Sequence, residues 1–133
     1  MKTKLTIERD RWIRGGKNGR ANNPRRFPEL QKENERPVRR VTSALRTQSG
    51  TMCCLGFACH AAGVPLDKLD YKSYPTMLHP RVKQRHFTGV WAFLDDDVVI
   101  AEMAKVNDIN GHKNRVVALR ELFKAQGVEL EVI

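Results

Sequence analysis

Residues 51–65, TMCCLGFACHAAGVP, decide the fold of this chain. The stretch is apolar almost all round, which predicts a helix buried in the centre of the core. Thr51 or Ser49 can cap the beginning of this helix, and Gly63 is suited to its end. Because Gly56 has no side chain, we expect another element to approach the helix closely at that point.

The two ends of the chain alternate between apolar and polar residues, as strands with one buried face do. Residues 2–8 read KTKLTIE, and residues 128–133 read VELEVI. The apolar faces carry Leu5 and Ile7 in the first segment and Val128, Leu130 and Val132 in the second. The polar faces carry Lys2 and Lys4 in the first and Glu129 and Glu131 in the second. The sequence therefore predicts two strands that share a core, with ion pairs between their polar faces.

Helical spacing appears in several segments between these strands. Residues 115–126, RVVALRELFKAQ, have one apolar stripe, with Asn114 placed to cap the helix and Gly127 placed to end it. Residues 97–106 fit a helix, although a β-hairpin with an acidic turn at 95–97 is the alternative. Short helices are also expected within residues 37–47 and at about 80–85.

These elements predict an α+β fold in which a small sheet, formed by the N- and C-terminal strands, is packed by three or four helices. We expect residues 1–133 to form a single domain with a long basic loop at about 14–37. No segment reaches the length of a membrane span and no apolar leader begins the chain, so we expect a cytoplasmic protein without a membrane partner. Three cysteines, an odd number, indicate reduced thiols.

Positive charge is concentrated in residues 9–46, which we call the basic segment. The basic segment has twelve Lys or Arg and four acidic residues, a net charge of +8 out of +9 for the whole chain. Such a field attracts phosphates or an acidic protein surface, although a solvated loop without a ligand is the alternative. The residues that we expect to bind an anionic ligand are Arg14, Lys17, Arg20, Arg25, Arg26, Arg39 and Arg40.

The cysteines of the central helix admit two interpretations. Cys53 and Cys54 fall in its first turn, where unpaired backbone N–H groups favour a thiolate and a nucleophile. Alternatively, all three cysteines are small buried side chains, which is the more common role of a free cysteine.

The sequence predicts neither a metal site nor a cofactor. No C-x-x-C pair is present, and Cys53 and His60 are about 10 Å apart along a helix. The acidic residues 95–97 are expected to cap a helix or form a solvated turn, although they also offer carboxylates to a divalent cation. The glycines at 15, 16 and 19 lack the spacing of a phosphate-binding loop.

Several motifs lie along the chain: W-x-R-G at residues 12–15, CCLGF at 53–57, Asn107-Asp108, Arg115 and the GVELEV ending. Together they resemble a set of uncharacterised bacteriophage and prophage proteins. The residues expected to form the structural motif are Trp12, Cys53, Cys54, Leu55, Gly56 and Phe57. The resemblance implies a phage accessory protein for host takeover or anti-defence, which binds nucleic acid, a nucleotide or a host protein in the host cytoplasm. Inhibition of a host enzyme with an acidic surface is the alternative that it leaves open.

A second similarity suggests an enzyme. Residues 54–57, C-x-G-F, followed by GVPL at 63–66, are similar to the nucleophile region of NlpC/P60-type cysteine peptidases, whose pattern is D-C-S-G-F. Cys53 stands where that family has Asp, and Leu55 stands where it has Ser. In this hypothesis Cys54 is the nucleophile and pairs with His86 or His112.

Overall fold

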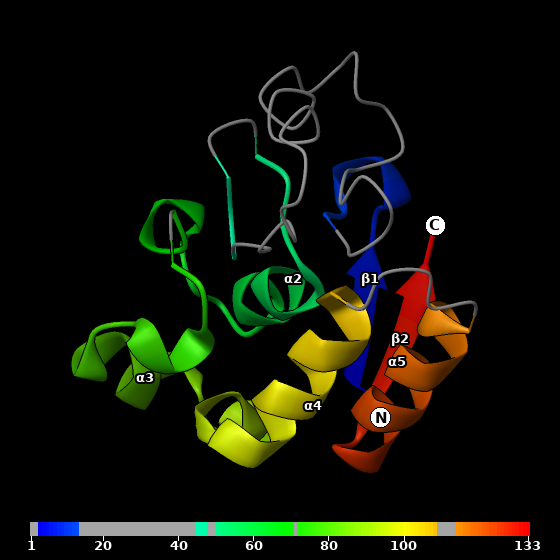
Figure 1. Cartoon of the computed structure of the whole chain (residues 1–133). Helices are drawn as coiled ribbons and strands as arrows, with labels where there is room; N and C mark the ends of the chain where they lie inside the picture. Colours follow the sequence, from blue (N-terminus) through cyan, green and yellow to red (C-terminus); the bar gives the residue numbers. More distant parts are fainter. Residues whose placement is uncertain (1–2, 14–44, 48–49, 71, 109–113) are drawn as a thin grey trace.

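The first and last elements of the chain pair with each other in a two-stranded sheet (Figure 1). In the computed structural model, which describes residues 3–13, 45–47, 50–70, 72–108 and 114–133, β1 (Thr3–Ile7) and β2 (Val128–Val132) are parallel. Leu5 is paired with Leu130, and both side chains are buried. The predicted α+β fold, with a small sheet made by the terminal strands, is confirmed.

The predicted charge pairing across the sheet is also present. Lys4 Nζ lies 3.4 Å from Glu131 Oε2 on the polar face of the sheet. The strand register places Lys4 opposite Glu129, so this ion pair is a diagonal contact. Lys2 lies outside the described residues.

Helix α2 (Cys54–Ala61) occupies the centre of the core, as its sequence predicted. Its end is the predicted one, because Gly63 has a φ of 108° and donates to the carbonyl of His60 while Val64 donates to that of Cys59. The predicted cap at Thr51 or Ser49 is wrong, because Cys53 is the N-cap residue and its side chain makes no capping bond. The close approach at Gly56 is confirmed: a Cβ there would lie 1.9 Å from the carbonyl oxygen of Leu45.

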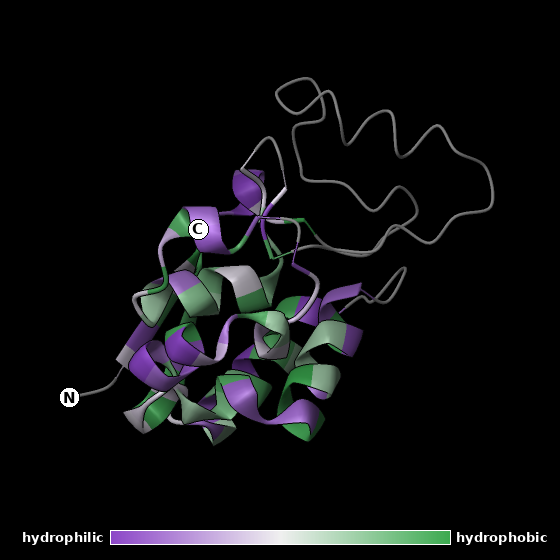
Figure 2. Ribbon diagram, turned by 90° about the vertical axis from the view of Figure 1, so that its left-hand side faces the viewer, coloured by the Kyte–Doolittle hydropathy of each residue, from purple (hydrophilic) through white to green (hydrophobic). Residues whose placement is uncertain are grey.

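Helices α4 (Asp97–Asp108) and α5 (Arg115–Ala125) complete the packing around the sheet. Figure 1 shows α5 beside β2 and α2 on the far side of β1, and both pairs of elements are in contact. The hairpin alternative for 95–97 is wrong, because Asp96 Oδ1 accepts hydrogen bonds from the amides of Val98 and Val99 and so caps α4. Figure 2 shows hydrophobic and hydrophilic residues alternating along the helices, as expected when one face is buried.

The remaining elements are short. They are α3 (Pro80–His86) and the 3-10 helices η1 (Arg9–Arg11), η2 (Leu66–Lys68), η3 (Pro75–Met77) and η4 (Gly89–Asp95). Among the described residues, the buried apolar side chains form one cluster, and no helix is both long and apolar enough to cross a bilayer.

Several predictions fall on residues that the structure does not describe. These are the long basic loop at about 14–37 and most of the short helix within 37–47. The described end of that predicted helix, residues 45–47, is not helical. Asn114 is the N-cap residue of α5 as predicted, but its side chain makes no capping bond.

Candidate functional site

The three cysteines are free thiols and all are buried. Burial raises the pKa of Cys53 to about 12, and the nearby charge of Asp108 adds to this effect. Burial likewise raises the pKa of Cys54 and of Cys59 well above the ordinary value. Desolvation therefore outweighs the effect of the helix N-terminus, and the thiols stay protonated at neutral pH.

The neighbourhood of Cys54 also opposes the hypothesis of a cysteine nucleophile. Cys54 Sγ faces the carbonyl oxygen of Met103 at 3.9 Å. His86 lies at the other end of α2, because a Cβ on Gly63 would be 2.9 Å from its Nδ1. Cys54 is the first residue of α2, and the helix is about 12 Å long, so the thiol and this imidazole are at opposite ends of it. The cavity beside Cys53 has a volume of about 10 Å³, room for about one water molecule. His112 lies outside the described residues.

A buried asparagine joins the motifs at residues 12–15 and 53–57 into one hydrogen-bond network. Asn107 is fully buried, and its Oδ1 accepts from Trp12 Nε1 at 2.7 Å and from the Cys54 amide at 3.1 Å. Its Nδ2 donates to the Ile13 carbonyl at 3.1 Å and to Asp108 Oδ1 at 2.8 Å. Asn107 therefore satisfies the first amide of α2 and fixes residues 12 and 13 against the core.

Asp108 and Arg115 extend this network toward the surface. Arg115 Nε donates to the Val106 carbonyl at 3.1 Å. Partial burial lowers the pKa of Arg115, while the negative charge of Asp108 opposes that change. An Arg side chain keeps its proton in such surroundings. The hydrogen bond from Arg115 to Val106 joins the last turn of α4 to the beginning of α5.

Both ends of the basic segment are fixed in the core. At the first end, Trp12 and Ile13 are buried and the Ile13 amide donates to the Met52 carbonyl at 2.9 Å. At the second end, Leu45 is buried, its amide donates to the Lys72 carbonyl at 2.7 Å, and the neighbouring Arg46 bonds Asp70 at 2.7 Å. The seven predicted ligand residues, Arg14, Lys17, Arg20, Arg25, Arg26, Arg39 and Arg40, lie outside the described residues.

A groove of about 430 Å³ opens between β1 and α2, beside these two ends. The sequence gives no sign of this groove, because its walls come from segments far apart in the chain. Its charged and polar lining comes from Arg11 and Arg46, which belong to the basic segment, and from Glu8, His60 and Thr6. The remaining lining residues are Leu5, Gly50, Met52, Phe57, Ala61 and Leu66.

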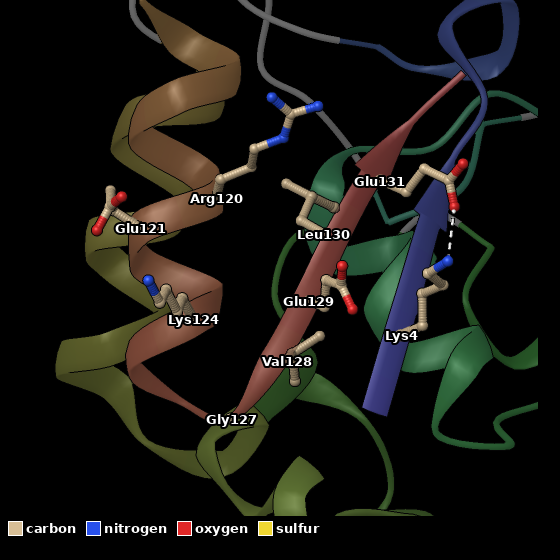
Figure 3. A pocket seen from close by; sticks show the side chains of 9 residues that line it. All are labelled: Lys4, Arg120, Glu121, Lys124, Gly127, Val128, Glu129, Leu130 and Glu131. Carbon is tan, nitrogen blue, oxygen red and sulfur yellow. Dashed lines mark ion pairs between the residues drawn. The ribbon is translucent and has the colours of Figure 1, made fainter. Parts of the chain in front are cut away.

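A larger groove, of about 720 Å³, lies over the polar face of the sheet beside α5 (Figure 3). Its charged lining is balanced: Lys4, Arg120 and Lys124 against Glu121, Glu129 and Glu131. Figure 3 shows Lys4 and Glu131 already paired across the strands. Because the opposite charges are equal in number, this groove does not favour an anionic ligand.

Across the part of the chain that the structure describes, no three His, Cys, Asp or Glu side chains are grouped closely enough to hold a metal ion. No protein-family model, curated protein or solved structure matches this chain.

Proposed function

We propose that this protein binds an anionic ligand, nucleic acid or a nucleotide, through the basic segment. The observation that carries the proposal is the location of the charge. Residues 9–46 hold +8 of the net charge of +9, and both ends of this segment are fixed in the core through Ile13 and Leu45. The rest of the chain is nearly neutral, so the positive charge lies in one segment that is attached to the core at both ends.

The composition of the segment suits phosphate groups. Ten of its twelve basic residues are Arg, whose planar guanidinium forms paired hydrogen bonds with phosphate oxygens. The similarity of the W-x-R-G and CCLGF motifs to phage proteins supports a phage-type accessory role in host takeover or anti-defence, in the host cytoplasm. The burial of Cys53 and Cys54 opposes the alternative of a cysteine hydrolase.

Salt dependence of binding tests the proposal. The wild-type protein is titrated into labelled single-stranded and double-stranded oligonucleotides and, separately, into ATP. If the seven predicted side chains contact phosphates of a nucleic acid, its affinity falls roughly 10³-fold or more between about 50 and 200 mM salt.

Two results would contradict the proposal. One is the absence of binding to every probe at low salt, and the other is an affinity that does not change with salt. The first result together with capture of an acidic host protein would favour the inhibitor alternative.

A further inference from the structure

The groove between β1 and α2 has cationic groups at the ends of the basic segment. Arg11 Nε lies 3.8 Å from Glu8 Oε2, a weak ion pair between two exposed side chains. Arg46 bonds Asp70 through Nη1 and retains further N–H donors, since a guanidinium has five. Gly50 has a φ of 90°, and a Cβ there would lie 3.3 Å from Arg11 Nη1. Glycine thus keeps this part of the groove open.

The groove also has an apolar wall. Met52 and Phe57 line it while being only 6% and 8% exposed, so they present one edge each from the core. Leu66, at the beginning of η2, is half-buried and lines the same groove. Such an apolar surface suits a flat aromatic group more than a phosphate chain.

The edge of β1 that faces away from β2 supplies directional hydrogen-bonding groups. The Ile133 amide donates to the Ile7 carbonyl, and the Arg9 amide donates to the Ile133 carbonyl. In a parallel pair these partners alternate along the strand, so the amide and carbonyl of Thr6 point away from β2. Thr6 lines the groove and is exposed. A donor and an acceptor side by side match the edge of a nucleobase.

We propose that this groove is a nucleotide subsite, with the phosphates at Arg11 and Arg46 and the base between Thr6 and the apolar wall. Its volume of about 430 Å³ falls in the range of small-molecule sites. The assignment rests on the proposed function and makes it more specific, because it places one nucleotide unit against the folded body of the protein.

A groove-filling variant tests the subsite. Ala61 is exposed, lines the groove and is the last residue of α2, so Ala61→Trp blocks the groove without disturbing the core. The matched control is Ala125→Trp, because Ala125 is also exposed and is the last residue of α5. Isothermal titration with ATP is expected to show Kd raised at least about tenfold by Ala61→Trp and unchanged by Ala125→Trp.

Two further measurements separate this proposal from the function it rests on. Arg11→Gln is expected to weaken ATP binding as well, while inorganic phosphate competes only weakly because it lacks the base. If wild type binds salt-sensitively but Ala61→Trp binds ATP like the control, the subsite is refuted and the proposed function stands. If wild type binds no anionic probe, the proposed function itself fails.

Discussion

Replacement of Asn107 by Ala is expected to destabilise the fold strongly. The side chain is fully buried; among the described residues its Oδ1 accepts from Trp12 Nε1 and the Cys54 amide, and its Nδ2 donates to the Ile13 carbonyl and to Asp108. Alanine would leave three buried groups without this partner: the Trp12 indole N–H, the Cys54 amide and the Ile13 carbonyl. An unsatisfied buried polar group costs about 1–3 kcal/mol.

Three such groups give a loss of about 3 kcal/mol or more in the free energy of unfolding. For a chain of 133 residues this corresponds to a Tm lower by about 10 °C. Chemical denaturation followed by tryptophan fluorescence measures the free energy directly, since Trp12 reports on the network itself.

Asn114→Ala is the matched control, because Asn114 is exposed and its side chain makes no capping bond. We expect this control to change the free energy of unfolding by less than about 0.5 kcal/mol. A loss of under about 1 kcal/mol for Asn107→Ala would refute the reasoning that the network fixes residues 12 and 13.

Three other predictions concern stability. Gly56→Ala is expected to cost about 1–3 kcal/mol in urea denaturation despite the better helix propensity of Ala, because its Cβ would meet the Leu45 carbonyl; unchanged stability would contradict this. The pKa of Cys53 rises from 9.0 to about 12 on folding, so the protonated thiol contributes fully to the free energy of unfolding below pH 9.0, and this contribution is lost as pH rises toward 12. A Tm that does not change over that pH interval would contradict the burial of Cys53. A double-mutant cycle on Lys4 and Glu131, which are 57% and 47% exposed, should give a coupling below about 1 kcal/mol, and a larger value would show a less solvated pair.

The sheet and the helices were largely predictable because their patterns are local. Alternation in KTKLTIE and VELEVI defined the two strands and the charge pairing between them. The spacing of apolar residues distinguished the helix at 97–108 from a hairpin. Alternation does not encode strand direction, however, so the parallel pairing of β1 and β2 came only from the structure.

The hydrogen-bond network around Asn107 could not be predicted from local sequence patterns, because it joins residues that are 53 to 95 positions apart. A signal was present, because Asn107 follows Ile100 and Met103 on the buried stripe of α4, where an apolar residue is the ordinary choice. The cap of α2 was misassigned for the same reason: the first amide is satisfied by a side chain 53 residues away. The groove beside Arg11 and Arg46 likewise combines segments that are distant in sequence.

The central claim is that affinity for an anionic ligand depends on the positive charge of the basic segment and not on the net charge of the whole protein. Two variants that each remove four positive charges separate these ideas. The first replaces residues of the basic segment by Ser: Arg25, Arg26, Arg39 and Arg40. The second replaces exposed residues elsewhere by Ser: Lys68, Arg81, Lys105 and Arg120.

Fluorescence anisotropy with a labelled single-stranded oligonucleotide, over a series of salt concentrations, compares both variants with wild type. The account predicts that the first variant loses affinity and that its slope of log K against log salt becomes shallower by about 3, while the second variant keeps the wild-type slope. Equal losses in the two variants would contradict the account, because net charge alone would then explain the binding.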